Sequence, residues 1–373
     1  HAPVSALVTL TSTADITALL CHSIFSRSLG YSCNYHDADI FRHISKVKLY
    51  FVKNIYNQVN VSSCFICSVQ RICTFLACGF LLKYEVLFAV CEEFSSQVTE
   101  ELQALPLLPD PEPITFQVAK CSLPKTPLIV GGEESRPGEF PHMVAVGFAL
   151  GNTILWSCGG TLISNKFVIT ACHCTFNSGP PTVVRLGAHN LAYQDDPKWV
   201  DDPVSRVILH PSYTAQSKYN DIALLELQNA VTFTEVIRPA CLWQDSTISQ
   251  TKAIATGWGK IGYTEETSDV LMKVQLDLID SVRCNEKISN MKSLKNGIVA
   301  SQLCAGDLSG GRNDTCQGDS GGPLVVSSTT NRCVFNLLAV TSFGFGCGSG
   351  FPAVYSRISS FIPWIESEVW PNQ

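Results

Sequence analysis

The chain has 373 residues, a formal net charge of −6 and 17 cysteines. The length predicts two or more structural units, and the cysteine count indicates an oxidising, extracellular compartment, so we expect a secreted protein. Charged residues make up 16% of the chain, and this low share together with the negative balance excludes nucleic acid as a predicted partner.

We expect no membrane span. The most apolar stretch, Cys73 to Val90, is interrupted by Lys83 and Glu85. The chain opens on His1, and no methionine precedes Met143, which is typical of a fragment or a mature form. Any signal peptide would therefore lie upstream of His1.

Residues 1–90 form an N-terminal pro-region for which the sequence predicts no fold. Cysteines at positions 21, 33, 64, 67, 73 and 78 favour a disulfide module. The spacing Cys64-x2-Cys67-x5-Cys73-x4-Cys78 also permits a zinc site, but its apolar surroundings argue against one. A poorly ordered segment is the third interpretation.

Residues 91–128 read as a linker and activation segment. Six prolines lie between Pro106 and Pro127, including the run Pro109-Asp-Pro-Glu-Pro113. Such a composition favours an extended polyproline conformation. An extended, exposed segment is what a processing protease requires.

Residues 129–373 contain many short apolar runs separated by turn residues, a pattern that predicts an all-β sandwich or barrel. The chain ends differently, because Ile358, Phe361, Ile362 and Ile365 recur at helical spacing and predict a short amphipathic helix. The expected strands are Met143–Ala149, Thr161–Thr170, Val183–Gly187, Val204–Leu209, Ala253–Gly257, Leu271–Leu278, Pro323–Val326 and Phe335–Ser342.

The segment Asn313-Asp-Thr-Cys-Gln-Gly-Asp-Ser-Gly-Gly322 predicts a nucleophile. It sets Ser320 beside an acid and among glycines that let the backbone direct N–H groups at a carbonyl oxygen. A serine hydroxyl needs a base to deprotonate it. Thr170-Ala-Cys-His-Cys174 supplies His173, and Asp221 opens the strand-like run Asp221-Ile-Ala-Leu-Leu225. The order His173, Asp221, Ser320 is one of the known orders of a catalytic triad.

From Ile129 onward the chain resembles the chymotrypsin-like (trypsin family) serine proteases, and within them the snake-like, clip-type proteases of arthropod haemolymph cascades. The resemblance covers about two thirds of the chain. It implies two six-stranded antiparallel β-barrels with the triad between them, an acyl-enzyme mechanism and no cofactor. Residues 1–90 lack the adjacent cysteines that end a clip domain. The motifs that carry the resemblance are Ile129-Val-Gly-Gly132, Pro141-His142-Met143, Cys158-Gly-Gly160, Thr170 to Cys174, Asp221 to Leu225, Arg238-Pro-Ala-Cys-Leu-Trp243, Gly257-Trp-Gly259 and Asp314 to Pro323.

The resemblance implies a zymogen switch. Cleavage after Leu128 would free the ammonium of Ile129 to pair with Asp319 and complete an oxyanion hole built from the N–H groups of Gly318 and Ser320. Because Leu128 is apolar, we expect an upstream activating protease with an apolar preference rather than self-processing.

The family pattern also implies the substrate pocket. Asp314 would form its floor and select Lys or Arg, and Ser342-Phe343-Gly344 would form its wall and pair with the substrate backbone. Ala353 stands where relatives usually carry glycine, so we expect a narrowed base that favours Lys over Arg.

Two further departures concern cysteine and metal. Cys172 replaces the usual alanine before His173, and the interpretations are a core thiol, a mispaired disulfide with Cys158 or Cys174, or a metal ligand. We expect no metal site. Calcium is disfavoured because Ala188 replaces the usual glutamate, and the acids nearby are expected to form a solvated loop. Those acids are Asp195, Asp196, Asp201 and Asp202.

The resemblance implies the disulfides, and two sequons indicate glycosylation. The sequons are Asn60-Val-Ser62 and Asn313-Asp-Thr315, of which we expect the second to be unused. The expected disulfides are Cys158–Cys174, Cys284–Cys304, Cys316–Cys347, Cys121–Cys241 and, for the remaining pair, Cys91–Cys333.

The sequence therefore predicts a secreted serine endopeptidase zymogen that cuts after Lys or Arg. The expected partners are a downstream zymogen as substrate, the upstream activator and serpin-type inhibitors. The alternative is a catalytically impaired homologue that acts as a binding or regulatory module, and Cys172 and Ala353 keep this alternative open.

Overall fold

The computed structural model divides into two units, His1–Ala77 and Cys78–Gln373. It describes residues 87, 90–91, 93–94, 99–104, 112–119, 121, 132–176, 179–193, 198–259, 267–288, 293–306, 319–328, 331, 333–344 and 351–371. The cysteine module, the zinc alternative and both sequons predicted above lie outside these residues.

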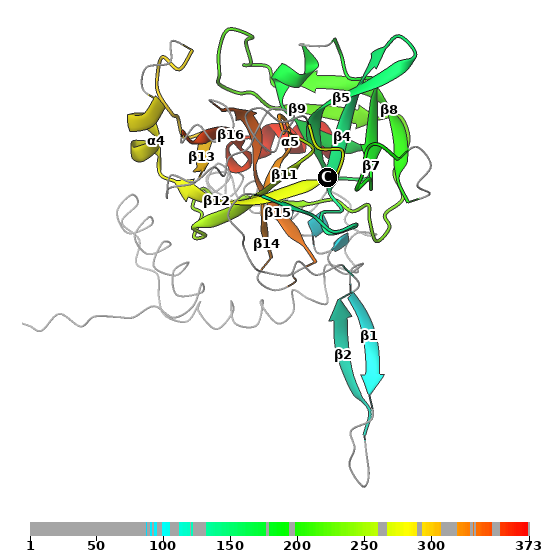
Figure 1. Cartoon of the computed structure of the whole chain (residues 1–373). Coiled ribbons are helices and arrows are strands. Elements are labelled where there is room, and N and C mark those ends of the chain that lie inside the picture. Colours follow the sequence, from blue (N-terminus) through cyan, green and yellow to red (C-terminus); the bar gives the residue numbers. More distant parts are fainter. Residues whose placement is uncertain are drawn as a thin grey trace, which may run out of the picture. The chain divides into compact units, whose positions relative to one another are not determined.

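The first barrel is a closed antiparallel sheet in the order β4-β5-β6-β9-β8-β7 (Figure 1). Pairing between β4 and β7 closes it. Its strands are β4 (Met143–Leu150), β5 (Thr153–Leu162), β6 (Phe167–Thr170), β7 (Val183–Leu186), β8 (Val200–Leu209) and β9 (Ala223–Leu227).

The second barrel follows the order β15-β14-β11-β12-β13-β16, and pairing between β15 and β16 closes it. Two short strands extend this sheet: β10 (Cys241–Leu242) runs parallel to β15, and β3 (Glu133–Glu134) pairs with β12. The predicted two-barrel architecture is thus confirmed. The barrel strands are β11 (Lys252–Gly257), β12 (Met272–Ile279), β13 (Gln302–Gly306), β14 (Pro323–Ser327), β15 (Phe335–Phe343) and β16 (Ala353–Arg357).

Strand β4 shows why the core forms as it does. Successive side chains on a strand point to opposite faces. Val144, Val146 and Phe148 therefore fill the interior of the first barrel, whereas Met143 and Ala145 join a second apolar cluster that also contains residues of β15 and the C-terminal helix. Because both faces of β4 are buried, its sequence is a continuous apolar run rather than an alternating one.

The C-terminal helix lies where the apolar spacing predicts it. A 3₁₀ turn, Ile358–Ser360, leads into α5 (Ile362–Val369). Ile358, Phe361 and Ile365 are buried in the cluster shared by the two barrels. The other helix of the second barrel, α4 (Ser281–Ile288), was not predicted, because its eight residues bury only Cys284 and Ile288.

One predicted strand was wrong. The run Thr161–Thr170 holds the end of β5, a turn and all of β6. At the turn, the Ser164 hydroxyl accepts hydrogen bonds from the N–H groups of Lys166 and Phe167 at 3.2 and 3.1 Å. A short polar side chain that satisfies its own backbone neighbours favours a turn over a continuous strand.

The linker also differs from its expected extended form. β1 (Thr99–Ala104) and β2 (Ile114–Ala119) pair as an antiparallel hairpin, with Thr99 opposite Ala119. Proline cannot donate to a strand ladder. Both strands are free of proline, and four of the six linker prolines fall between them, in residues 105–113.

The disulfide pairing of the linker was predicted wrongly. The structure contains Cys158–Cys174 and Cys284–Cys304, but it joins Cys91 to Cys241 and Cys121 to Cys333. The expected pairs Cys121–Cys241 and Cys91–Cys333 have exchanged partners. The reason is proximity: all four cysteines pack in one apolar cluster with Val334, so their order along the chain does not decide the pairing. Cys316 and Cys347 lie outside the described residues.

Two of the acids expected in a solvated loop are structural. Asp201 lies on β8 and accepts two hydrogen bonds from the Arg185 guanidinium, at 2.8 and 2.9 Å. The guanidinium carbon lies 3.2 Å from the centroid of the Trp199 ring and 4.7 Å from that of Trp156. Asp202 is buried and accepts a 3.0 Å hydrogen bond from the side chain of Asn229. The two hydrogen bonds between Arg185 on β7 and Asp201 on β8 fix these two strands against each other.

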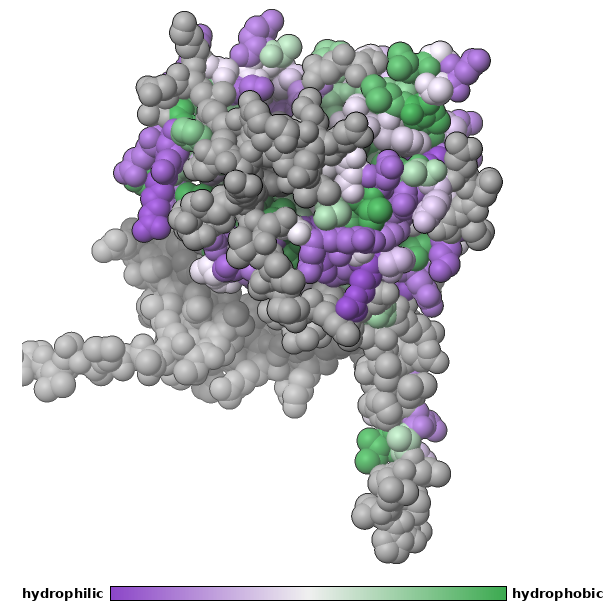
Figure 2. All heavy atoms as spheres, in the orientation of Figure 1, coloured by the Kyte–Doolittle hydropathy of each residue, from purple (hydrophilic) through white to green (hydrophobic). Residues whose placement is uncertain are grey.

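Apolar side chains are exposed near the tip of the β4–β5 hairpin, where Leu150, Ile154 and Leu155 all face solvent. Figure 2 shows hydrophobic residues gathered on the part of the surface over these strands. Among the described helices, none has the length and apolar character needed to cross a membrane.

Candidate active site

The predicted base, His173, and its predicted orienting carboxylate, Asp221, come from the first barrel. His173 lies in a 3₁₀ turn, Cys172–Thr175, directly after β6, and Asp221 lies directly before β9. β6 and β9 are paired, with Thr170 opposite Ala223, so the two side chains are brought together. The distance from His173 Nδ1 to Asp221 Oδ2 is 2.8 Å, and the His173 backbone N–H donates to Asp221 Oδ1 at 2.9 Å.

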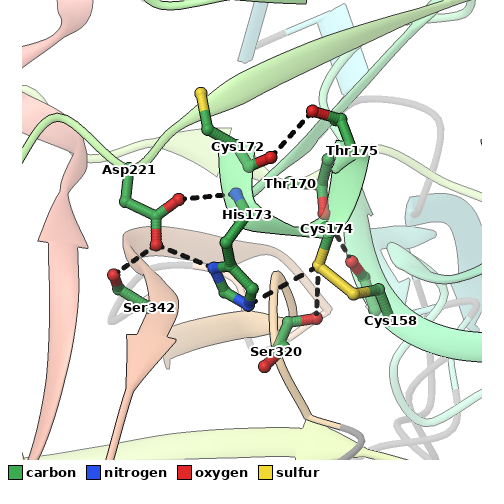
Figure 3. Close-up of a disulfide and its surroundings, with 10 residues drawn as sticks. Cys158, Thr170, Cys172, His173, Cys174, Thr175, Asp221, Ser320 and Ser342 are labelled. Atoms are coloured by element: carbon green, nitrogen blue, oxygen red, sulfur yellow. Dashed lines mark hydrogen bonds and ion pairs between the residues drawn. A yellow bond between two sulfur atoms is a disulfide. The ribbon is translucent and has the colours of Figure 1, made fainter. Parts of the chain in front are cut away.

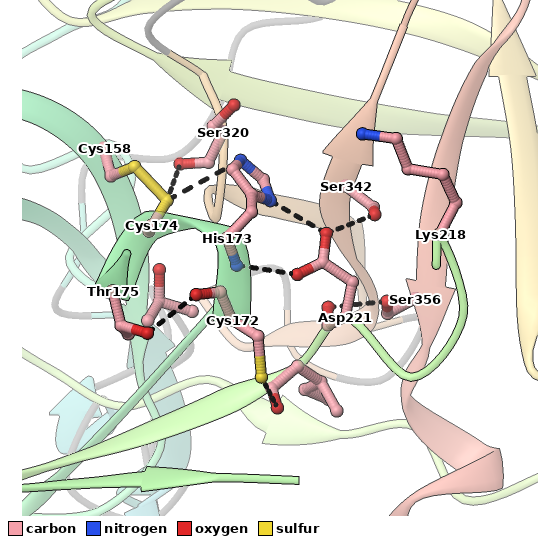
Figure 4. A network of polar contacts seen from close by, with 12 residues as sticks. Cys158, Cys172, His173, Cys174, Thr175, Lys218, Asp221, Ser320, Ser342 and Ser356 are labelled. Atoms are coloured by element: carbon pink, nitrogen blue, oxygen red, sulfur yellow. Dashed lines mark hydrogen bonds and ion pairs between the residues drawn. A yellow bond between two sulfur atoms is a disulfide. The ribbon is translucent and has the colours of Figure 1, made fainter. Parts of the chain in front are cut away.

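The second barrel completes the surroundings of Asp221 (Figure 4). The Ser342 hydroxyl, on β15, donates to Asp221 Oδ2 at 2.5 Å. The Ser356 hydroxyl, on β16, donates to the Asp221 carbonyl oxygen at 2.7 Å. Asp221 is only 3% exposed. Burial by itself would raise the pKa of Asp221, but hydrogen bonds from His173 and Ser342 outweigh it and hold that pKa below its usual value.

Ser320 is positioned by backbone contacts. Its carbonyl oxygen accepts a 2.8 Å hydrogen bond from Gly159 N–H, and Gly321 N–H donates to Thr341 O at 2.9 Å. Gly321 has a φ of +77°, and a Cβ there would collide with the hydroxyl of Thr170. The motif around Gly159 and the motif around Ser320 are therefore complementary parts of one close backbone contact.

The Cys158–Cys174 disulfide lies beside both His173 and Ser320, and Cys174 approaches each of them (Figure 3). Cys174 Sγ is 3.9 Å from His173 Nε2 and 3.6 Å from the Ser320 carbonyl oxygen. Within the described part of the chain, the Ser320 hydroxyl and His173 Nε2 form no hydrogen bond. Such bonds are often loose without substrate and tighten only in a complex, so this geometry is compatible with a nucleophile and its base.

The arrangement can perform acyl transfer. His173 is oriented by a buried, ionised carboxylate that fixes the proton on Nδ1 and leaves Nε2 to accept one. Ser320 lies against the Cys158–Cys174 disulfide, and its backbone is held there by the hydrogen bond from Gly159 of the first barrel.

The comparisons with known proteins agree with this chemistry. Residues 129–365 match the family model described as Trypsin. The chain belongs to the trypsin family of serine proteases. It is 43% identical over 263 residues to Serine protease snk of Drosophila melanogaster, covering 68% of this chain and 59% of that protein. It is 40% identical over 257 residues to Serine protease Hayan of Drosophila melanogaster, covering 67% and 40% respectively.

A third relative is Proclotting enzyme of Tachypleus tridentatus, 36% identical over 296 residues, which cover 74% of this chain and 77% of that protein. The chain therefore spans less than two thirds of the length of the two Drosophila relatives. The matched region holds His173, Asp221 and Ser320.

Asp319, next to Ser320 in this trypsin-family chain, packs on the Gly257-Trp-Gly259 motif. Its Oδ1 accepts a 3.0 Å hydrogen bond from Gly259 N–H. A Cβ on either Gly257 or Gly259 would meet the Asp319 carboxylate. The two glycines therefore leave the space that the acid occupies, which the motif alone did not reveal.

Cys172 is a free, fully buried thiol. Its Sγ donates to the Ile222 carbonyl oxygen at 3.0 Å, and burial raises its pKa to about 12. The thiol is therefore protonated and unreactive. Because Cys158 and Cys174 are bonded to each other, the mispaired alternative is wrong.

Cys158, His173 and Cys174 place three potential ligand atoms within 4.8 Å of one another. Zinc requires thiolates, and both sulfurs here are committed to a disulfide. The donor set therefore does not fit a metal ion.

The predicted pocket is described in part. Ser342 and Phe343 end β15, followed by Gly344, and Ala353 is buried in the core of the second barrel with Tyr355. The remaining predicted site residues lie outside the described residues: Asp314, Gly318, Leu128 and Ile129.

Sequence reasoning missed two contributors. Ser356 holds the backbone of Asp221, and Gly159 holds that of Ser320. The glycine pair after Cys158 was an available signal, because adjacent glycines in a strand often mark a close backbone approach. No comparable signal marks Ser356, because its contact with Asp221 arises only when β16 lies beside the segment that precedes β9.

Proposed function

We propose that the protein is a secreted serine endopeptidase, made as a zymogen, that cuts protein substrates after Lys or Arg. The observation that supports this most directly is the buried Asp221–His173 pair, with the Ser320 segment held at the same disulfide. The Ser320 hydroxyl would attack the scissile carbonyl while His173 Nε2 takes its proton. His173 would then return the proton to the leaving amine, and water would release the acyl group by the same route.

Activation would follow cleavage between Leu128 and Ile129 by an upstream protease with an apolar preference. The new Ile129 ammonium would pair with Asp319 and shape an oxyanion hole from the N–H groups of Gly318 and Ser320. Support comes from the chain just after the bond: Gly132 has a φ of +72°, and β3 is paired to β12. Residues 129–131 would therefore move as a short segment from a fixed point at β3.

Specificity would come from Asp314, as the carboxylate at the floor of the pocket. Ala353 would narrow the base and favour the slim Lys side chain over the planar Arg group. Ser342, Phe343 and Gly344 would pair with the substrate backbone as an added strand. Support comes from the end of this segment, where Phe343 is half-buried and Gly344, directly after β15, is exposed.

The extracellular location is supported by the four disulfides among the described residues. The names of the relatives, which include a proclotting enzyme and a melanization protease, support a place in a proteolytic cascade. A downstream zymogen would be the substrate, and serpin-type proteins would be the inhibitors.

The test is to replace Pro127-Leu128 with a specific protease site and release Ile129 on demand. The expected result is labelling of Ser320 by a fluorophosphonate only after cleavage, together with turnover of Lys and Arg peptides and a preference for Lys. Absence of labelling in folded, correctly cleaved protein would instead support the binding or regulatory homologue.

A further inference from the structure

Lys218 is a cation beside the catalytic network that the proposed mechanism does not use. It lies three residues before Asp221, and its ammonium nitrogen is 5.2 Å from the centroid of the Phe343 ring. Figure 4 shows its side chain reaching toward the side of Asp221 where Ser342 lies.

The backbone around Lys218 is fixed. Its carbonyl oxygen accepts a 2.9 Å hydrogen bond from the Gln302 side chain. The neighbouring Tyr219 hydroxyl donates to Gly297 O at 2.9 Å and accepts from Asn296 N–H at 2.9 Å. The ammonium is therefore presented from a rigid segment at a defined place next to β15.

The charge of Lys218 is available to a ligand. Within the described ranges, no carboxylate forms an ion pair with it. The nearest acid of the network, Asp221, is buried and already bonded to His173 and Ser342. The ammonium lies over the Phe343 ring, and Lys218 as a residue is half-buried, so the side chain is held while part of it remains accessible.

We propose that Lys218 selects an acidic side chain at the second or fourth substrate residue on the N-terminal side of the cleaved bond. This inference rests on the proposed function, in which the substrate pairs with Ser342, Phe343 and Gly344. Side chains of an extended strand alternate between two faces, so the second and fourth residues share one face and the first and third share the other.

The positions of Ala353 and Lys218 decide which face of the substrate strand meets Lys218. Ala353 belongs to the core of the second barrel, whereas Lys218 belongs to the segment of the first barrel that carries Asp221. The first substrate residue points into the pocket at Ala353, so its neighbours on the opposite face point toward Lys218. The favoured substrate is thus a segment with an acidic residue shortly before a basic one.

The experiment uses the cleaved enzyme and four peptides with Lys at the cleavage position. Two carry Glu or Gln at the second residue, and two carry Glu or Gln at the fourth. We expect at least a fivefold higher kcat/KM for Glu than for Gln at one of these positions, decreasing as salt is added. In Lys218→Met this ratio falls to about one, and in Lys218→Glu it inverts. Lys166→Met, on the turn between β5 and β6, is the matched control and keeps the preference.

Equal cleavage of the Glu and Gln peptides by an enzyme that labels at Ser320 would overturn the role of Lys218 and leave the proposed function standing. An unchanged Glu preference in Lys218→Met would do the same. Failure of both labelling and cleavage would overturn the proposed function and this inference together.

Discussion

Two titratable groups of this protein are almost equally buried, and they have opposite surroundings. Asp221 is 3% exposed and its carboxylate accepts hydrogen bonds from His173 and Ser342. His142 is 1% exposed, packs against Phe140 and Phe335, and neither of its ring nitrogens has a hydrogen-bond partner among the described residues.

The two groups show how burial changes a pKa with and without hydrogen-bond partners. Burial lowers the pKa of His142 to about 3, so its ring is neutral and acts as an apolar filler. At Asp221 the partners reverse the effect of burial and keep the group charged. A buried group is thus available for electrostatic work only where the fold also supplies its partners.

We expect the largest effect from Asp221→Asn, which removes the charge of the buried carboxylate. An amide keeps the shape but donates where the carboxylate accepts, so it favours the wrong tautomer of His173. We expect kcat of the cleaved enzyme to fall by about 10⁴ with the fold unchanged. Peptide turnover measures this, with Asp277→Asn as control, a half-buried carboxylate on β12 that pairs with Lys252. A loss below tenfold would contradict the role of Asp221.

Ser342→Ala removes one partner of Asp221 and leaves the others. Hydrogen bonds to charged groups contribute about 1.5–3 kcal/mol, so we expect a decrease of roughly 10- to 100-fold in kcat/KM. The pKa of Asp221 should rise, because a donor to its charged form is lost. A carboxylate with a lowered pKa in the folded protein contributes stability above its unfolded-state pKa, and this contribution is lost as the pH falls below that value. Because the variant has a smaller pKa difference, its unfolding free energy should fall less between pH 5 and pH 3 than that of the unmodified protein. An equal fall in the two proteins, measured by urea denaturation, would count against this interpretation.

His142→Leu tests whether His142 is buried as a neutral ring. Between pH 6.5 and about 3 the unfolded chain binds a proton at His142 that the folded chain does not. Stability from this site is therefore complete above pH 6.5 and is lost as the pH falls. At pH 5 the loss is about 2 kcal/mol, at 1.36 kcal/mol per pH unit. The variant should gain that much in unfolding free energy at pH 5 relative to its gain at pH 8, measured by urea denaturation. Equal gains at the two pH values would show that His142 is not buried as a neutral ring.

The sequence was sufficient where short motifs carry the chemistry. Local patterns predicted His173, Asp221 and Ser320, which the structure brings close together, and short apolar runs and the resemblance predicted the two barrels. It was insufficient where partners are distant. The orphan character of His142 depends on Phe335, 193 positions along the chain, and the role of Ser356 depends on β16 meeting Asp221.

Local chemistry misled in two further places. Proline content predicted an extended polyproline linker, although two proline-free segments of it, β1 and β2, pair as antiparallel strands. The pairing of the linker cysteines was predicted wrongly because all four cysteines share one cluster, and their proximity in space allows more than one pairing.

The disulfide Cys121–Cys333 has a consequence for how the chain around the proposed cleavage site can vary. Cys121 is fixed to the second barrel on one side of that site, and β3 is fixed to the same barrel on the other. The chain between Cys121 and β3 is therefore anchored at both ends to the same barrel. Insertions or deletions in the β1–β2 hairpin would not change the number of residues between these two anchors. A change of length between 122 and 131 would change it, and with it the distance that the Leu128–Ile129 bond can extend into the active site of an activating protease.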